Sequence, residues 1–350
     1  MRQQRRGPAR PAIETRSQLL SVLTEACELE HGLACSYLFA AFSIRDQEDG
    51  QLDAKQLVAA RKWAGQLYVI AAQEMLHLAQ VWNLLVAIGG TPYYLRPNFP
   101  QRARYYPLNV PLELERFGTR ALQRFLAYER PRALTLPWPS FAPPETAPDL
   151  YDTVGDLYEK VAEAFEAIPE KELFVARPDR QTGPALVDFP DIVRVTDRVS
   201  SRAAIQLLTV QGEGTERDRE DCHFGLFHRT LQELEAAGFD PARPVLSNPA
   251  AKDRGDYSAA EPNVVDDPFS STAMDLFDDV YQLMLRGLSY AFTARAGDGL
   301  AGDLARFSIA VMPVVIKPFG EALTELPAGP TYPDECAGAA FGMSRHVLLP

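Results

Sequence analysis

The longest apolar pattern in the chain runs from Ala54 to Ile88 and repeats every three or four residues. The positions that share one face of this predicted helix are Leu67, Ile70, Glu74, His77, Val81, Leu85 and Ile88. Glu74 and His77 therefore stand where the pattern expects Leu or Ile, about one helical turn apart. Because burial of an unpaired carboxylate is costly, the pattern predicts that other polar groups meet Glu74 inside the protein.

The same periodicity predicts further helices along most of the chain. The predicted helices cover approximately residues 17–42, 54–88, 112–128, 150–168, 191–211, 216–237, 271–296 and 300–326. The first two are joined by a short polar turn and should form an antiparallel hairpin. The period-2 alternation that marks strands is nearly absent, so the predicted fold class is all-α.

Composition along the chain divides it into three parts. Residues 15–330 are predicted to form a single domain, between a disordered basic tail at residues 1–14 and an irregular tail at residues 331–350. Within the domain, residues 91–150 are rich in Pro and aromatic residues. A connection of this length is usually functional or crosses from one end of a bundle to the other. The helices within residues 271–326 are additions to the bundle.

Charge and composition exclude several classes of protein. The chain is 46% hydrophobic and 23% charged, as in ordinary globular proteins. Its net charge of −12 argues against a nucleic-acid partner. No run reaches the roughly 18 uncharged apolar residues of a membrane span, and the basic N-terminus lacks the apolar stretch of a secretory signal. With 4 Cys and no Cys-x-x-Cys, the cytoplasm is the expected compartment.

The chain contains two Glu-x-x-His motifs. Of its 5 His, two follow a Glu by three residues, in Glu74-Met-Leu-His77 and Glu220-Asp-Cys-His223. Ferritin-like di-metal proteins place this motif on each of two helices and a single Glu on each of the other two. The sequence therefore predicts two single Glu residues on partner helices.

On the first predicted helix, Glu30 falls in the apolar stripe with Cys27 and Ala34. It is the predicted ligand from that helix. The neighbouring His31 points away from the Glu30 face and is interpreted as a core histidine or one that supports a ligand.

The other single acid is Glu213, which has a glycine on each side. The glycines favour a break between two helices, with Glu213 and the Glu220/His223 pair near their shared turn. One continuous helix would also keep Glu213, Glu220 and His223 on one face. In that case Glu159 or Glu163 would supply the fourth carboxylate.

The predicted metal ligands are four carboxylates and two imidazoles: Glu30, Glu74, His77, Glu213, Glu220 and His223. Oxygen and nitrogen donors without thiolate suit iron or manganese better than structural zinc. Four carboxylates also neutralise two divalent cations, so two Fe²⁺ per chain are expected, with manganese as the alternative. A mononuclear site and a set of core ion pairs are the other interpretations, although few Arg or Lys fall in the same stripes.

Several short segments carry a family resemblance. They are Glu28-Leu-Glu30-His31, Glu74-Met-Leu-His77-Leu78, Ala87-Ile-Gly-Gly-Thr-Pro92, Gln211-Gly-Glu-Gly214, Cys222-His223-Phe224 and Pro327-Ala-Gly-Pro330. In this order they resemble the ferritin-like domain of iminophenyl-pyruvate dimer synthases, of the violacein- and rebeccamycin-pathway type, from about residue 15 to 330. One departure is Cys222, where that family usually has Ser.

The resemblance implies a ferritin-like four-helix bundle with a long crossover and additional C-terminal helices. It also implies a non-haem di-metal centre, often found among enzymes of secondary metabolism. The dimer synthases are much longer chains with additional regions, so their imine-coupling reaction is not carried over to this chain.

The expected function is a di-iron oxidase or oxygenase that activates dioxygen to oxidise a small organic substrate. The alternatives are a ferroxidase or other iron-handling protein, and a metal-free helical scaffold. The expected partners are the substrate, dioxygen and a second copy in a homodimer, with no nucleic acid and no membrane. Residues 91–139 and the last two helices are expected to shape the substrate pocket, and Tyr37 to support a ligand.

Overall fold

The structure is a computed structural model, and helices account for most of the residues that it describes. It describes residues 12–101, 110–132, 134, 151, 153–176, 180–187, 189–212, 220–251, 263–294 and 298–343. The predicted all-α class is confirmed. The two strands described, β1 (Pro249–Ala251) and β2 (Asn263–Val265), form one small parallel pair.

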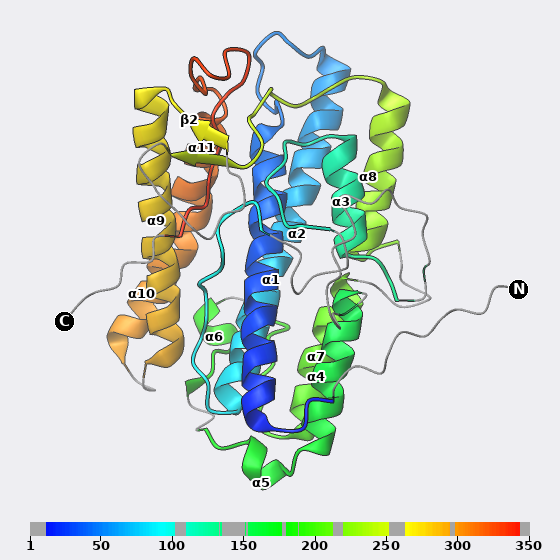
Figure 1. Cartoon of the computed structure of the whole chain (residues 1–350), viewed down its shortest axis with the longest axis vertical. Coiled ribbons are helices and arrows are strands. Elements are labelled where there is room, and N and C mark those ends of the chain that lie inside the picture. The colour runs from blue at the N-terminus through cyan, green and yellow to red at the C-terminus, as the bar shows by residue number, and fades with distance from the viewer. Residues whose placement is uncertain are drawn as a thin grey trace, which may run out of the picture.

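Two long helices, α1 (Arg16–Ser43) and α2 (Ala54–Ala87), form the predicted hairpin and run through the centre of the molecule (Figure 1). Each begins with a reciprocal capping box, Thr15 with Gln18 and Asp53 with Gln56, which satisfies the first backbone N–H groups. Just beyond the end of α2, Gly89 adopts the left-handed conformation, with φ 85°.

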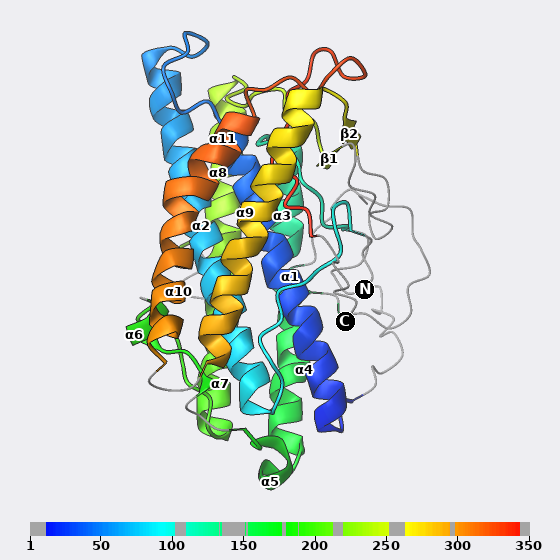
Figure 2. The ribbon, with the colours of Figure 1, turned by 90° about the vertical axis from the view of Figure 1, so that its left-hand side faces the viewer.

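Four shorter helices complete the bundle as two interrupted columns. They are α3 (Thr119–Tyr128), α4 (Val154–Ala167), α7 (Arg198–Gly212) and α8 (His223–Ala237). In both views α3 lies above α4 in one column, and α8 lies above α7 in the other (Figures 1 and 2). The ends of α3 and α7 meet: a Cβ atom on Gly212 would lie 3.0 Å from Glu129 Oε2. Both columns are therefore interrupted at one level of the bundle.

Three predicted helices begin seven residues later than their sequence pattern indicates. Leu112 and Leu114 are extended instead of helical, since Gln101 N donates to Leu112 O and Leu114 N to Asn248 Oδ1. The helix predicted from residue 191 begins at Arg198 and the one predicted from residue 216 begins at His223. Apolar periodicity continues through these starts, so it does not locate them. At the start of α7, Asp197 Oδ1 accepts from Ser200 N, whereas α3 and α8 begin without a side-chain cap. The short helices α5 (Glu170–Leu173) and α6 (Pro184–Val187) lie in the connection between α4 and α7.

The C-terminal helices form an outer layer beside the bundle (Figure 2). The layer contains α9 (Pro268–Thr293) and a column made of α10 (Gly299–Val311), the π-helix η2 (Met312–Ile316) and α11 (Lys317–Leu323). By length and composition alone, the column Gly299–Leu323 could cross a membrane, with a mean hydropathy of 1.6. Core helices of soluble proteins share these properties, so the expected absence of a membrane partner stays a prediction.

The segment after residue 330 has neither helix nor strand as far as residue 343, yet it packs into the core. Phe341 is fully buried, and its ring lies 5.3 Å from Phe277, 5.1 Å from Tyr281 and 6.1 Å from Phe42, measured between centroids. This irregular segment therefore joins the outer layer to α1.

The contact between α11 and α1 leaves no room for a side chain at Gly320, because a Cβ atom there would overlap the Phe42 ring. We expect Gly320→Ala to lower the free energy of unfolding by about 1–3 kcal/mol. The control is Gly65→Ala on the exposed face of α2, where no atom lies within 4 Å of the added methyl group. It should raise stability by about 0.4–1 kcal/mol. Urea denaturation measures both, and a shift of the same sign in the two variants would contradict this packing.

Candidate metal centre

Five buried side chains from four helices converge at the level where the two columns are interrupted. Glu30 lies on α1, Glu74 and His77 on α2, Glu129 follows the last residue of α3, and His223 is the first residue of α8. All five are at most 4% exposed. Such a concentration of acid and imidazole in the core requires compensation.

The five residues form two triads that share Glu74. In each triad, Glu30/Glu74/His77 and Glu74/Glu129/His223, the potential ligand atoms all lie within 4.8 Å of one another. Glu74 Oε2 lies 3.1 Å from His77 Nδ1, and Glu74 Oε1 lies 2.8 Å from His223 Nδ1. The outer carboxylates are slightly farther away, since Glu30 Oε2 and Glu129 Oε1 each lie 3.4 Å from their nearest imidazole Nδ1. A carboxylate between two triads is the arrangement of a ligand that bridges two cations.

Two potential ligand atoms of the cluster lack a hydrogen-bond partner. Glu74 Oε1 and His223 Nδ1 are both buried and only 2.8 Å apart, yet their relative orientation does not make a hydrogen bond. Buried polar atoms are rarely left without a partner, and a metal ion is one of the explanations that account for them. These residues therefore fit a di-metal group.

The second ring nitrogen of each histidine meets a glutamine. His77 Nε2 lies 2.9 Å from Gln211 Oε1, and His223 Nε2 lies 3.0 Å from Gln73 Oε1. When each Nε2–H donates to its glutamine oxygen, Nδ1 is left as the free lone pair that faces the carboxylates. Such partners orient a metal-binding imidazole and fix its tautomer.

Two tyrosines hold the outer carboxylates. The Tyr37 hydroxyl donates to Glu129 Oε1 over 2.6 Å, and the Tyr158 hydroxyl, from α4, donates to Glu30 Oε1. Tyr37 therefore supports a carboxylate of the cluster, as expected from its place in the stripe of α1. His31 is a core histidine, with Nδ1 at 2.7 Å from Tyr94 O and Nε2 at 2.7 Å from the Tyr281 hydroxyl.

Without a cation, the cluster is neutralised by protons. Burial raises the pKa of Glu30 to about 7, and the nearby Glu74 charge adds to the shift. Burial also acts on Glu74, but the imidazolium groups of His77 and His223 outweigh it and hold the pKa of Glu74 well below its usual value. Burial opposes the charging of His223, yet Glu74 and Glu129 raise its pKa to about 9. A divalent cation would replace these protons.

These shifts predict that the metal-free protein loses stability as the pH rises. His223 has a pKa of about 9 in the folded protein and 6.5 as a model group, so its contribution is full below pH 6.5 and disappears as the pH passes 9. The loss should be on the order of 3 kcal/mol. Thermal unfolding of the metal-free protein between pH 6 and pH 9.5 measures it, with His223→Asn as the control that should make the profile less steep by the contribution of His223. A melting temperature that rises over this range would contradict the assignment.

Of the predicted ligands, the structure brings together Glu30, Glu74, His77 and His223. Glu220 is a correction: it is exposed in the turn before α8, where its backbone carbonyl accepts from Arg229 Nη2. Glu-x-x-His spacing places two side chains on one face only when both residues are helical, and α8 begins at His223. Glu213 lies outside the described residues, so its predicted role stays a prediction.

The carboxylate that the sequence analysis missed is Glu129. It completes the second triad in place of Glu220. A signal was present, because Leu122, Phe125 and Glu129 follow one another at helical spacing and the first two are buried. Because the surrounding sequence is rich in Pro, the sequence pattern assigns Glu129 to a connection between helices instead of to the ligand set.

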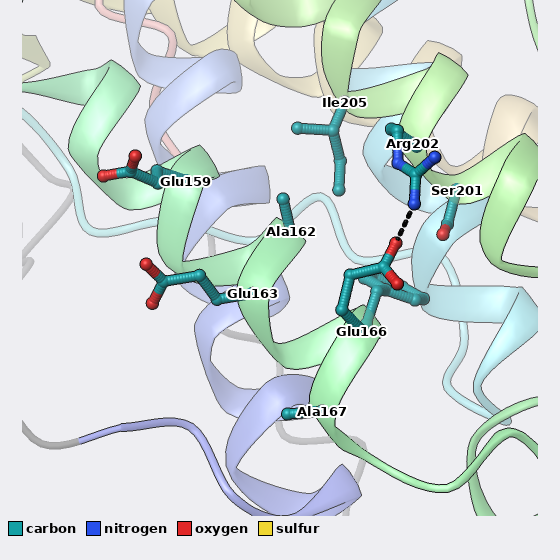
Figure 3. Close-up of a pocket in the computed structure, with 9 residues that line it drawn as sticks. Glu159, Ala162, Glu163, Glu166, Ala167, Ser201, Arg202 and Ile205 are labelled. Atoms are coloured by element: carbon teal, nitrogen blue, oxygen red, sulfur yellow. Dashed lines mark hydrogen bonds and ion pairs between the residues drawn. The ribbon is translucent and has the colours of Figure 1, made fainter.

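The two acids that the continuous-helix alternative would use lie elsewhere. Glu159 and Glu163 line an outer groove of about 490 Å³ between α4 and α7, together with Glu166 and Arg202 (Figure 3). Glu159 pairs with Arg132 at 2.6 Å, and neither acid belongs to a triad in the part of the chain that the structure describes. A much smaller cavity, of about 20 Å³, adjoins Glu30, Glu74, His77 and Glu129. It has room for about one water-sized molecule.

A family model described as ferritin-like matches residues 23–232, a range that contains all five residues of the two triads. The chain belongs to the ferritin-like family. A solved ferritin-like protein from Caulobacter vibrioides has the same fold, with a TM-score of 0.56 and 16% identity over 86% of this chain and 96% of that one. The predicted ferritin-like bundle is therefore confirmed.

Two curated relatives match nearly the whole chain. One is 2-imino-3-(indol-3-yl)propanoate dimerase from Chromobacterium violaceum, 31% identical over 92% of this chain and 33% of the relative. The other is dichlorochromopyrrolate synthase from Lentzea aerocolonigenes, 28% identical over 91% of this chain and 35% of the relative. The chain thus spans about a third of the length of each. The resemblance is confirmed, and both names describe enzymes, in agreement with the prediction that this ferritin-like chain is one.

Proposed function

We propose that this ferritin-like chain is a di-iron oxidase or oxygenase that uses dioxygen to oxidise a small organic substrate. The observation that carries the proposal is the pair of buried triads that share Glu74. Two cations bridged by a carboxylate and held by one imidazole each are the arrangement expected of a di-iron carboxylate centre.

The chemistry of the donors supports iron. The triads offer three carboxylates and two imidazoles, without thiolate. Manganese binds the same donor types, and nothing in the cluster favours it over iron. Glu213 remains a proposed further ligand, because in the sequence it directly follows Gly212, the last residue of α7.

Ferrous ions held by the two triads would supply electrons for the reduction of dioxygen. The residues of the chain keep the centre in order. Gln73 and Gln211 orient the imidazoles, and Tyr37 and Tyr158 orient the outer carboxylates. Burial keeps bulk water away from the carboxylates. With a pKa of about 7 in the metal-free cluster, Glu30 can hold or release a proton near neutral pH.

The names of the relatives guide the choice of substrate class. One name specifies an indolyl imino acid, so we propose an aromatic, amino-acid-derived substrate for this chain. The dimer-forming reaction itself is not proposed, because the chain spans about a third of each relative. A cytoplasmic location without nucleic-acid or membrane partners remains part of the proposal.

The test combines iron content with dioxygen uptake. The chain is loaded anaerobically with Fe(II), desalted and exposed to dioxygen alone or with indole-3-pyruvate and ammonium. We expect two irons per chain and repeated turnover of dioxygen only with the organic compound. Uptake with Fe(II) alone, unchanged by the organic compound, would indicate a ferroxidase. Fewer than one iron per chain would leave a metal-free scaffold as the better description.

A further inference from the structure

A second cavity, of about 480 Å³, lies between the bundle and the outer layer of C-terminal helices. Its walls come from α1, α2, α9, α10 and η2, and the described residues that line it include none of the triad residues. On α2 the cavity meets Ala71, Met75 and Ala79, a different face of the helix from Glu74 and His77. It is therefore separate from the candidate metal centre.

Two features of the sequence create this space. The wall formed by α2 carries alanines where a packed core would carry larger side chains, among them Ala71 and Ala79. The opposite wall contains the π-helix Met312–Ile316 with Pro313 inside it. Single-turn π-helices are rare and occur frequently at functional sites. The cavity is open to solvent, since Ala72 and Pro313 in its lining are exposed, and an apolar pocket of this size is typical of small-molecule sites.

The lining of the cavity sets the chemistry of the ligand. Its described residues are apolar except for four with polar atoms, and each of these four has a partner inside the protein. Tyr68 and Lys317 both donate to Glu321 Oε1, at 2.6 Å and 2.5 Å. The Tyr281 hydroxyl lies 2.7 Å from His31 Nε2, and Trp82 Nε1 donates to Tyr93 O over 2.7 Å. A charged ligand would find no free counter-charge there.

We propose that this cavity binds an uncharged aromatic molecule. Its volume lies in the range of small-molecule sites, about 300–1,000 Å³. Aromatic residues from three sides, Phe42, Trp82 and Phe292, supply faces against which a ring can pack. The proposal does not depend on the metal centre, because no residue of the triads contributes to it.

The test uses indole as a neutral probe and indole-3-acetate as its anionic counterpart, with binding measured by calorimetry on the full chain. Saturable binding of indole is expected, with the anion at least about tenfold weaker because its charge would be buried unpaired. Ala79→Phe and Leu288→Trp, from opposite walls, should each weaken indole binding at least about tenfold by filling the space. Val69→Phe, on the exposed face of α2, is the matched control.

Circular dichroism establishes that each variant is folded, and iron content gives a second check for the variants outside the metal centre. Glu74→Gln should bind indole like the original chain, which separates this site from the metal centre. The proposal is overturned if indole does not saturate, if the anion binds equally well, if the filled variants bind normally, or if Glu74→Gln loses indole binding.

A different observation concerns the outward faces of α9 and α10. On α9 the exposed apolar residues recur every seven positions, at Phe269, Leu276, Leu283 and Tyr290. On α10 and η2 they recur at the same interval, at Leu300, Phe307 and Val314. All seven are between 44% and 71% exposed, and a seven-residue apolar repeat is the pattern by which helices pack against other helices.

The charges between these residues match an antiparallel copy of the same helix. If a two-fold axis passes α9 at Leu283, Leu276 lies opposite Tyr290 of the second copy. The same axis brings Asp279 within one residue of Arg286 of the second copy. Opposite charges thus face each other on both sides of the axis.

The column beside α9 carries the second repeat. α9 and α10 lie side by side, and a Cβ atom on Gly287 would overlap Ser308 Oγ, so these two residues are level (Figure 2). Because the two helices are antiparallel, Leu283 is level with Met312, which lies between Phe307 and Val314. The exposed apolar residues of the column therefore lie on both sides of the level at which the axis passes α9.

We infer that this outer face binds a second copy of the chain through α9 and α10, which gives the expected homodimer a specific interface. A lipid bilayer is the less suitable partner, although the column Gly299–Leu323 is apolar enough for one. Asp279, Arg286, Asp303 and Arg306 lie on the same exposed faces, and charged side chains are costly within a membrane.

Light scattering on the full chain, combined with sizing, tests the interface. The chain should be a dimer, and Leu283→Asp should make it monomeric because two carboxylates would meet at the axis. Asp279→Arg should weaken the dimer at least about tenfold by facing Arg286 of the second copy, and the exchange Asp279→Arg with Arg286→Asp should restore it. A monomeric original chain, failure of the exchange to restore the dimer, or binding to vesicles of phosphatidylcholine and phosphatidylglycerol would overturn the inference.

Discussion

We expect Glu74→Gln to abolish binding of both irons at the proposed centre, because the two triads share this one carboxylate. Changes to residues that merely support a metal ligand already cost about 10–100-fold in affinity, so loss of the shared ligand should cost more at each position. Gln keeps the shape of the side chain, but its single oxygen is neutral and cannot bridge two cations. Iron content per chain after anaerobic loading and desalting measures the effect, and circular dichroism establishes the fold.

The matched control for this experiment is Glu163→Gln. Glu163 is exposed on α4, pairs with Lys160 at 2.6 Å and lines the outer groove instead of the centre. Its replacement should leave the iron content unchanged. If Glu74→Gln retained two irons, or if Glu163→Gln lost one, the triads would not be the metal-binding groups.

The sequence predicts one half of the centre well because its helices are continuous. Glu30, Glu74 and His77 lie within long, uninterrupted helices, where a polar residue in an apolar stripe stands out. Their predicted meeting follows from the hairpin, since two antiparallel helices with a short turn must face each other. The residues, the helices and the pairing were thus all available from the spacing of apolar positions.

The other half could not be obtained in this way, because its residues lie at helix ends. Glu129 follows the last residue of α3 and His223 opens α8, so neither lies inside a periodic pattern that would indicate its direction. The apolar periodicity predicts a helix that includes Glu220. Because α8 begins only at His223, Glu220 lies in the turn before the helix. Which interrupted column faces α1 and α2 is a tertiary property, decided by contacts such as that of Glu129 with Gly212.

The interruptions themselves have a consequence for the site. Glu129 and His223 come from helices that stop at the centre, whereas Glu30, Glu74 and His77 come from the continuous helices α1 and α2. Side-chain hydrogen bonds hold the first two: Tyr37 donates to Glu129, and Gln73 Oε1 lies 3.0 Å from His223 Nε2. We therefore expect relatives of this fold to vary at Glu129 and His223 more than at the three residues on the continuous helices.

Replacing Glu129 with Gln will remove one iron and leave the other, because Glu129 belongs to a single triad. The remaining triad, Glu30 with Glu74 and His77, keeps its three donors. The same substitution at Glu220 should leave both irons in place, since that side chain is exposed in the turn before α8. Iron content and the antiferromagnetic coupling seen by Mössbauer spectroscopy measure the difference, as a single iron cannot couple.

This pair of variants distinguishes the ligand set that the structure indicates from the one that the Glu-x-x-His motif predicts. The Glu-x-x-His motif predicts loss of iron in Glu220→Gln and none in Glu129→Gln, whereas the structure predicts the reverse. Tyr37→Phe adds a graded test, because removal of the hydroxyl that donates to Glu129 should weaken the second iron by about 10–100-fold without abolishing it. Equal iron content in Glu129→Gln and the original chain would assign the second position to a carboxylate other than Glu129.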